Sequence, residues 1–133
     1  MNPRFLLDTH VVVRWFSELK KLSREQRRLL DDAVRQGVQV GVSAISLLEI
    51  ALLGAERKRL WPGVNDLFHQ LDTNPAIRII PLTTDIAQEV AALGSSLRDP
   101  ADRVIVATAR VHRLTLLTSD QRIVESGLVS TVE

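Results

Sequence analysis

The sequence predicts one α/β domain over residues 1–133, with a parallel sheet of four to five strands flanked by helices. Short apolar runs, typical of strands buried on both faces, alternate along the chain with segments of helical periodicity. No repeat, low-complexity segment or linker divides the 133 residues. A chain of this length can bury a single core without cross-links.

The composition excludes several kinds of site. The chain has no cysteine, so neither a disulfide framework nor a thiolate metal site can form. Its apolar stretches are shorter than the roughly 20 residues that span a membrane. Asp8 also interrupts the apolar N-terminal segment, which argues against a secretion signal. We therefore expect a soluble, cytoplasmic protein without a membrane partner.

The net charge of +1 conceals an uneven distribution. Residues 1–59 carry 11 Lys and Arg against 7 Asp and Glu, whereas residues 60–133 carry 6 against 9. Arginine supplies 14 of the 17 cations and suits bidentate phosphate contacts better than lysine does. A basic edge beside an acidic pocket is compatible with a nucleic-acid-binding protein, although the charge alone does not identify one.

The first predicted strand, residues 5–7, ends abruptly at Asp8. A carboxylate at the end of a buried strand lies where open α/β sheets place their ligands. Asp8 can equally be the N-cap of the next helix, expected over residues 11–16. His10 has two interpretations: it contacts a substrate, or it bonds to a backbone group near the first helix. We favour the second.

Ser23 begins a longer helix, because Ser23-Arg-Glu-Gln26 is a capping-box pattern, and Gly37 ends it. The second strand is predicted over residues 38–42. The polar face of the helix carries four arginines that form either a solvated surface or a rim facing phosphates. These are Arg24, Arg27, Arg28 and Arg35.

The helix predicted over residues 47–53 is apolar almost all round, which indicates burial or a partner surface. Glu49 is the one charge in its first two turns. Ser46-x-x-Glu49 is itself a capping box, which would explain the position of Glu49 without a function. A fully buried carboxylate would nevertheless need a cation or a metal, and we favour a functional role. Residues 57–59 close this helix or begin the loop that leads to residues 61–63.

The second half of the chain continues the alternation of helices and strands. Helices are predicted over residues 64–71, 86–97 and 121–125, and strands over residues 77–80, 114–118 and 128–132. His69 and His112 have no ligand spacing and are expected at the surface.

A further helix begins at Asp99-Pro100-Ala101-Asp102. Asp99 fits the N-cap, Pro100 the first helical position and Asp102 the third, where the helix dipole favours an acid. We expect Asp99 to accept from the backbone N–H of Ala101 or Asp102. Asp102 lies one turn inside, and its carboxylate is expected to point toward the cleft that holds Asp8.

Four acids follow strand ends or open the helix that leads to a strand: Asp8, Glu49, Asp102 and Asp120. The ends of parallel strands share one edge of a sheet, so these carboxylates can meet there. Each has a local explanation, but a common cause is simpler. Carboxylates so placed repel strongly without a divalent cation. Oxygen ligands without Cys or clustered His indicate Mg²⁺ or Mn²⁺, and the fitting chemistry is metal-assisted phosphodiester hydrolysis.

Four segments resemble, in order, the motifs of PIN-domain ribonucleases, and among these the VapC toxins of bacterial toxin–antitoxin pairs. They are Leu6-Leu7-Asp8-Thr9-His10, Ser43-Ala44-Ile45-Ser46-Leu47-Leu48-Glu49-Ile50, Asp99-Pro100-Ala101-Asp102-Arg103 through Ala107-Thr108-Ala109, and Leu117-Thr118-Ser119-Asp120. The resemblance covers essentially the whole chain. Each motif is weak alone, whereas four in sequence are more specific.

The resemblance implies a catalytic, metal-binding quartet that uses Mg²⁺ or Mn²⁺: Asp8, Glu49, Asp102 and Asp120. Thr9 and Thr118 match small hydroxyl residues beside it. The resemblance also implies an RNA substrate, a homodimer and an inhibitory cognate antitoxin. Asp99 matches an acid found in only part of the family, so it is either a ligand or a helix cap. Ser119 stands where the family often has Arg, so a phosphate contact is expected to be missing.

Two other functions compete with a nuclease. A phosphoacceptor signalling domain needs an acidic pair near the first strand and a lysine after a late strand. Here Asp8 stands alone and the lysines come early, at Lys20, Lys21 and Lys58. A catalytically silent PIN-fold module that binds RNA or protein is the stronger alternative, and the intact quartet argues against it.

The helix over residues 47–53 has more apolar surface than one core face can use. Exposed apolar patches of this kind mark interaction sites. We therefore expect a homodimer and a groove for an antitoxin segment, which would insert a basic side chain toward the acids.

Overall fold

The computed structural model describes residues 2–56 and 63–133 and confirms the predicted α/β fold. All strand pairs are parallel, and the strand order is β3-β2-β1-β4-β5. The strands are β1 (Phe5–Leu7), β2 (Val40–Ser43), β3 (Ile77–Ile80), β4 (Thr115–Leu117) and β5 (Thr131–Val132). The first strand of the chain is thus the central one.

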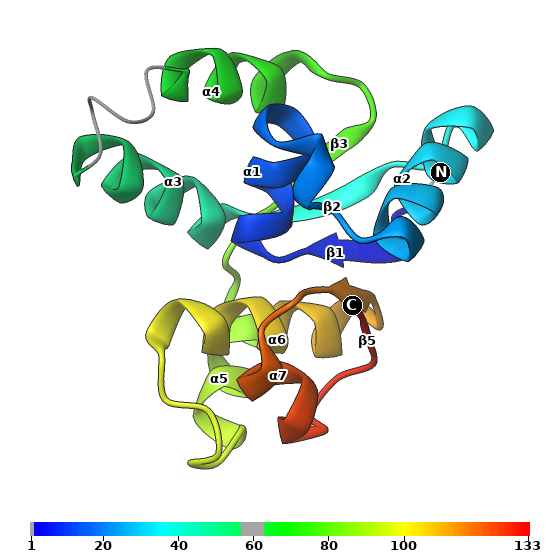
Figure 1. The fold of residues 1–133 in the computed structure, drawn as a ribbon. Coiled ribbons are helices and arrows are strands. Elements are labelled where there is room, and N and C mark those ends of the chain that lie inside the picture. The colour runs from blue at the N-terminus through cyan, green and yellow to red at the C-terminus, as the bar shows by residue number, and fades with distance from the viewer. Residues whose placement is uncertain (1, 57–62) are drawn as a thin grey trace.

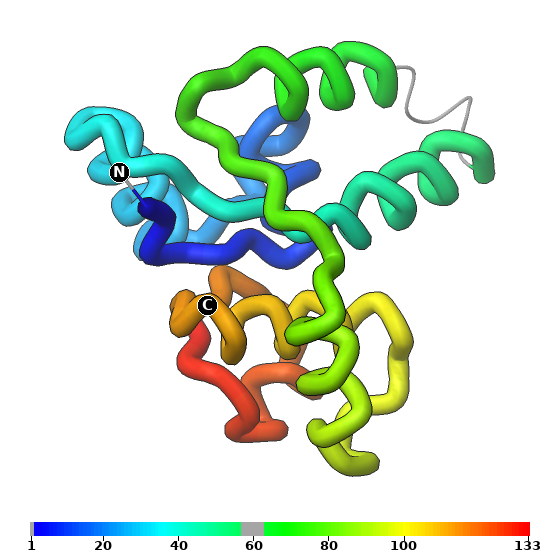
Figure 2. The backbone as a smooth tube through the Cα atoms, turned by 180° about the vertical axis from the view of Figure 1, so that it is seen from behind, coloured from blue at the N-terminus to red at the C-terminus, as the bar shows by residue number. Residues whose placement is uncertain are grey.

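Helices cover both faces of the sheet (Figures 1 and 2). One layer contains α1 (Thr9–Ser17), α2 (Arg24–Gln36), α3 (Ala44–Glu56) and α4 (Val64–Thr73), with a 3-10 turn at Leu19–Lys21. The other contains α5 (Thr84–Ala92), α6 (Pro100–His112) and α7 (Gln121–Ser126). No helix in the described ranges is long and apolar enough to cross a membrane.

Alternate residues of the strands face the two helical layers. Leu7 and Leu117 belong to the core beneath α1–α4, whereas Leu6 and Leu116 belong to the core beneath α5–α7. All four side chains are fully buried. The apolar runs in the sequence therefore form a sheet that is covered on both faces, as parallel sheets require.

The helix starts explain most of the element boundaries. Ser23 caps α2 by accepting from the Gln26 N–H at 3.0 Å, and Gly37 ends the helix with a φ of +67°. The return bond of a capping box does not form. Gln26 is instead fully buried and donates to the Val132 carbonyl at 3.1 Å, which ties β5 to α2.

The start of α3 differs from the prediction. This helix begins at Ala44, directly after β2, and not at residue 47. Ser43 accepts from the Ile45 N–H at 3.2 Å, so the first turn is supported from the end of the strand. The capping-box explanation of Ser46 and Glu49 is therefore wrong, because both lie inside the helix.

The end of α5 also differs from the prediction, since the helix stops at Ala92 and does not reach Leu97. Gly94 has a φ of +77°, which turns the chain away from the helix axis. Arg103 then donates to the carbonyls of Val90, Gly94 and Leu97. A side chain from α6 thus pairs with carbonyl groups at the end of α5 and in the loop that follows it.

The other boundaries shift by smaller amounts. The helix α1 starts two residues before the predicted range, and β2, β4 and β5 are shorter than predicted. The expectation for residues 57–59, and for the loop at 61–62, lies outside the described part of the chain.

Candidate functional site

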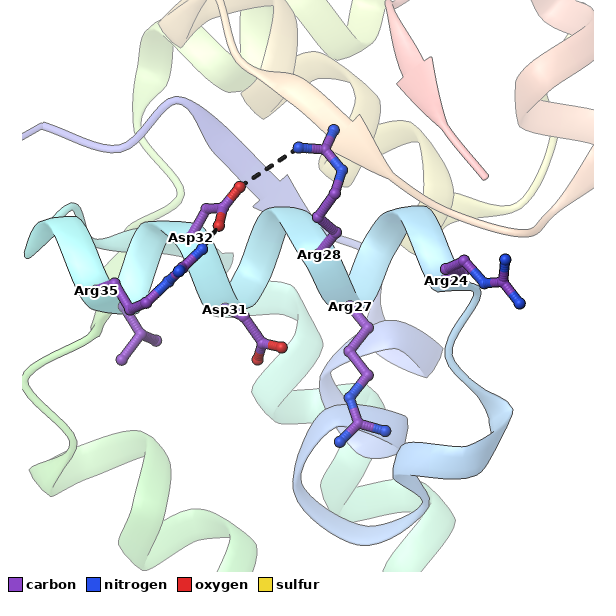
Figure 3. Close-up of a pocket in the computed structure, with 7 residues that line it drawn as sticks. Arg24, Arg27, Arg28, Asp31, Asp32 and Arg35 are labelled. Atoms are coloured by element: carbon purple, nitrogen blue, oxygen red, sulfur yellow. Dashed lines mark hydrogen bonds and ion pairs between the residues drawn. The ribbon is translucent and has the colours of Figure 1, made fainter.

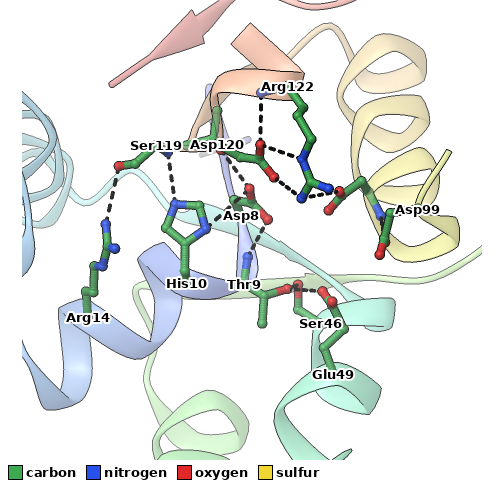
Figure 4. A network of polar contacts seen from close by, with 12 residues as sticks. Asp8, Thr9, His10, Arg14, Ser46, Glu49, Asp99, Ser119, Asp120 and Arg122 are labelled. Carbon is green, nitrogen blue, oxygen red and sulfur yellow. Dashed lines mark hydrogen bonds and ion pairs between the residues drawn. The ribbon is translucent and has the colours of Figure 1, made fainter. Parts of the chain in front are cut away.

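The four predicted acids lie at the carboxyl edge of the sheet, and Figure 4 shows Asp8, Glu49 and Asp120 there. Asp8 follows β1 directly, and Asp120 follows β4 after two residues. Glu49 comes from the second turn of α3, the helix that continues β2, and Asp102 from the first turn of α6. Three parallel strands and the start of one helix therefore bring the quartet to one place.

Asp8 is held in a fixed orientation at the end of the central strand. It is 4% exposed, and its extended backbone makes it the N-cap of α1. Oδ1 accepts from the Thr9 N–H at 2.8 Å, and Oδ2 accepts from the Thr118 hydroxyl at 2.7 Å. The cap and the site interpretations of Asp8 are thus compatible, because one carboxylate oxygen serves the helix and the other faces β4.

Thr118 connects the ends of β1 and β4. Its hydroxyl donates to Asp8 and accepts from the Asp120 N–H at 3.0 Å. The side chain is fully buried, so its hydroxyl has no competing water. This one group fixes the direction of the first acid and of the backbone that carries the fourth.

Thr9 makes the corresponding connection to α3. Its hydroxyl donates to the Glu49 carboxylate and lies 2.8 Å from the Ser46 hydroxyl. Because Thr9 has one hydroxyl proton, the Ser46 hydroxyl must be the donor in the second contact. Ser46 is fully buried and was not predicted as a site residue. The wrong start expected for α3 concealed its position.

Glu49 and Asp102 both have raised pKa values. Burial is the main cause of the raised pKa of Glu49, with Asp8 and Asp99 contributing through their negative charge. The pKa of Asp102, which is 8% exposed, rises to about 7. Burial is again the largest cause, followed by the charges of Asp99, Asp8, Asp120 and Glu49. The carboxylates are thus close enough to destabilise one another's ionised forms.

Asp99 caps α6 as predicted. Its Oδ1 accepts from the Asp102 N–H at 3.0 Å, and Pro100 occupies the first helical position. Its side chain is exposed, whereas Asp102 is buried. Asp99 therefore supports the helix that carries Asp102 and adds negative charge beside it.

A cation that the sequence reasoning missed lies between two of the acids. Arg122 in α7 places Nη2 3.0 Å from Oδ2 of Asp120 and 3.9 Å from Oδ2 of Asp102. Hydrogen bonding from Arg122 lowers the pKa of Asp120. The spacing of the two residues in the sequence could have indicated this pair. Asp120 caps α7 by accepting from the Arg122 N–H at 2.9 Å, so the two side chains leave the same helix turn.

His10 bonds to the backbone, as we favoured, although not near the first helix. Its Nε2 accepts from the Ser119 N–H at 2.9 Å, in the turn after β4. The proton of the neutral ring therefore sits on Nδ1, which lies 3.5 Å from Oδ2 of Asp8. Burial lowers the pKa of His10, and the charge of Asp8 opposes that shift.

The remaining predicted polar features lie outside this network. His69 and His112 are exposed, as expected. On α2, Arg28 pairs with Glu25. Arg28 and Arg35 also pair with Asp32 (Figure 3). Because these two arginines already pair with acids of the same helix, they fit a solvated surface better than a phosphate-binding surface.

The acids form a continuous polar network with three hydroxyls and one guanidinium. Each residue of the network contacts the next in the order Glu49, Thr9, Asp8, Thr118, Asp120, Arg122 and Asp102. Ser46 joins the network through its bond to Thr9. The oxygen-only donor set suits a hard divalent ion. Within residues 2–56 and 63–133, however, no three acidic or histidine side chains converge tightly enough to hold one ion as they stand.

Comparisons with known proteins agree with this architecture. The model of the PIN domain family matches residues 5–127. Ribonuclease VapC22 of Mycobacterium tuberculosis (strain ATCC 25618 / H37Rv) is 35% identical over 119 residues, which are 89% of this chain and 88% of the relative.

Two solved structures show the same fold over nearly the full chain. FitAcB from Neisseria gonorrhoeae is 26% identical with a TM-score of 0.73, and the match covers 97% of this chain and 96% of that one. A toxin–antitoxin complex from Klebsiella pneumoniae contains a chain that is 24% identical with a TM-score of 0.62, covering 96% and 95%.

Proposed function

As the chain belongs to the PIN-domain family, we propose that it is a VapC-type endoribonuclease toxin that hydrolyses RNA phosphodiester bonds with Mg²⁺ or Mn²⁺. We take the domain to comprise residues 1–133. The observation that carries the proposal is the polar network at the carboxyl edge of the sheet. It gathers four carboxylates, and burial together with the charges of the other acids raises the pKa of Asp102, so a bound cation would be favourable there. The ribonuclease name of the relative from M. tuberculosis supports RNA as the substrate.

The proposed ligands of the ion are Asp8, Glu49, Asp102 and Asp120. When bound, the ion would activate a water molecule and neutralise charge on the phosphate. The hydroxyls of Thr9 and Thr118 would keep Asp8 and Glu49 pointing into the site, since each already bonds to one of these carboxylates. Asp99 would act as a helix cap and not as a ligand, because its side chain is exposed and bonds to the Asp102 N–H, whereas Asp8 and Asp102 are buried in the site.

The test is cleavage of single-stranded RNA by the purified protein. We expect cleavage with Mg²⁺ or Mn²⁺ and none with EDTA, and restored cleavage when Mn²⁺ is added in excess. Asp8→Asn is the matched inactive variant, because Asn keeps the shape and can still accept the Thr9 N–H. Undiminished cleavage in EDTA would contradict the metal mechanism. Binding of RNA without any cleavage would instead favour the silent PIN-fold module.

We also propose a homodimer and a cognate antitoxin as partners. Leu48 and Leu52 on α3 are 53% and 54% exposed and lie one turn apart, so they present an apolar strip. A partner segment on this strip would lie on the helix that carries Glu49, close enough for a basic side chain to approach the acids. The chain of like fold from K. pneumoniae was solved as a toxin–antitoxin complex.

A further inference from the structure

Arg122 occupies the position where the acidic edge needs a cation. Besides its contacts to Asp102 and Asp120 through Nη2, its Nε lies 3.3 Å from Oδ1 of Asp120. Among residues 2–56 and 63–133, no other side chain forms an ion pair with either acid. The guanidinium therefore supplies positive charge to two of the four proposed metal ligands. Figure 4 shows its contact with Asp120.

A divalent ion held by Asp102 and Asp120 would compete with this guanidinium for their carboxylates. Oδ2 of Asp120 and Oδ2 of Asp102 are the atoms that Arg122 faces, and a metal bound by both acids would displace it. The exchange is inexpensive, because the Arg122 side chain is 75% exposed. Exposed ion pairs contribute little to stability, and water can solvate the displaced guanidinium.

A displaced Arg122 would remain beside the site, since the first turn of α7 anchors it two residues after Asp120. An RNA phosphate at the acidic edge offers oxygens that a planar guanidinium binds bidentately. The position before Asp120 lacks a cation because it is Ser119. Arg14 reaches only the Ser119 hydroxyl, at 3.3 Å. The side of the site formed by α7 thus has one arginine available, and it is Arg122.

We propose that Arg122 is a phosphate-binding residue that exchanges partners. In the metal-free protein it pairs with Asp102 and Asp120, and once a divalent ion neutralises these acids it binds an RNA phosphate. The inference rests on the proposed function for its RNA step, whereas the exchange between guanidinium and metal can be measured without RNA.

The first experiment measures Mn²⁺ binding by calorimetry or by the EPR signal of free Mn²⁺, without RNA. Arg122→Gln removes the competing charge and should tighten Mn²⁺ binding by about two- to fivefold, the range set by an exposed ion pair. Arg122→Lys should give a smaller change, because lysine keeps the positive charge that competes with the ion, which glutamine removes. Arg28→Gln is the matched control, since Arg28 pairs with Glu25 and Asp32 outside the network.

The second experiment measures binding of a single-stranded RNA analogue with hydrolysis-resistant linkages, in Mg²⁺ and in EDTA. In Mg²⁺, Arg122→Gln should weaken binding by roughly tenfold, as loss of a charge-assisted hydrogen bond does. In EDTA the variant and the native protein should bind equally, because the acids hold Arg122. Arg28→Gln should show no difference that depends on the metal. Thermal melting of all variants confirms that the exposed substitutions leave the fold intact.

Each result either supports or overturns the inference. Unchanged or weaker Mn²⁺ binding by Arg122→Gln would show that the guanidinium does not compete with the ion. If Arg122→Gln weakens RNA binding equally in Mg²⁺ and in EDTA, Arg122 attracts RNA only through its charge and does not exchange partners when the metal binds. If the native protein cleaves no RNA while both predicted differences appear, the nuclease function fails and the exchange stands. If RNA cleavage occurs and both differences are absent, only the exchange fails.

Discussion

Two acids three residues apart at the start of α6 have different surroundings. Asp99 is exposed, and its Oδ1 accepts a hydrogen bond from the Asp102 N–H. Asp102 is buried and lies close to the other acids. A helix-start pattern explains both positions in the sequence, so the pattern alone cannot assign their roles. Burial separates them, because an exposed acid tolerates its charge and a buried one does not.

Substitutions should separate these roles. We expect Asp102→Asn to abolish RNA cleavage while the metal-free fold stays at least as stable, since removal of a charge relieves repulsion. Asp99→Asn should keep most of the activity, because Asn caps nearly as well as Asp. Asp99→Ala should chiefly lower stability, by about 1 kcal/mol.

The measurement is thermal melting and RNA cleavage for the three variants in parallel. If Asp99→Asn is as inactive as Asp102→Asn while both melt normally, Asp99 belongs to the proposed ligand set. Its bond to the Asp102 N–H would then be a secondary feature.

The sequence identified the acids more readily than the residues that connect them. Asp8 and Asp120 stand out because a charge directly follows an apolar run. Ser46 and Arg122 have no such signal, since their contacts join elements that are distant in sequence or depend on how a short helix turns. Such contacts follow from tertiary packing, and periodicity does not encode them.

The same limit applies to whole elements. Each strand and α-helix of the described ranges was expected near its observed place, because buried strands leave apolar runs and the helices leave caps and apolar periodicity, whereas the 3-10 turn at Leu19–Lys21 was not predicted. The boundaries were less predictable. The early start of α3 depends on Ser43 at the end of β2, and the early end of α5 depends on Arg103 from the next helix.

The exposed strip of α3 leads to a prediction for the partners. Leu52→Glu places a charge on a side chain that is 54% exposed, so the folded monomer should keep its stability within about 0.5 kcal/mol. The same charge should weaken the proposed homodimer and the proposed complex with an antitoxin, because burying it would be unfavourable.

Sedimentation of the protein alone, and of the protein with its antitoxin, provides the measurement. Asp66→Asn on α4 is a control that changes the charge of an exposed position on a different helix. A native protein that stays monomeric at high micromolar concentration, with Leu52→Glu leaving the antitoxin complex unchanged, would contradict the prediction.

At the scale of the molecule, the parallel order of the strands concentrates negative charge at one edge. The net charge is only +1, so the crowding is local. Folding forces Glu49 and Asp102 into the neighbourhood of other acids, whereas the unfolded chain keeps them apart. The metal-free protein should therefore lose stability when these acids ionise.

The pH dependence of stability follows from the pKa of Asp102, about 7 in the folded protein against 3.8 when unperturbed. Between these values the native state holds a proton that the unfolded chain has released. The free energy of unfolding should therefore decrease as the pH rises through this window. The raised pKa of Glu49 acts in the same direction. His10 acts in the opposite direction, because folding lowers its pKa below 6.5. As the pH falls, the unfolded chain therefore takes up the proton before the folded protein does, which lowers the free energy of unfolding.

Comparison with Asp102→Asn isolates the contribution of Asp102, because both proteins retain Glu49 and His10. In EDTA, urea unfolding between about pH 5 and pH 8 should show the native protein losing stability relative to the variant as the pH rises. Saturating Mg²⁺ should reverse this trend, because ion binding favours the ionised carboxylates and stabilises only the folded protein that assembles them. If the free energy of unfolding of the two proteins in EDTA changes with pH in parallel, the folded protein does not raise the pKa of Asp102 toward neutral pH. Parallel curves in Mg²⁺ as well would show that Asp102 does not contribute to binding the ion.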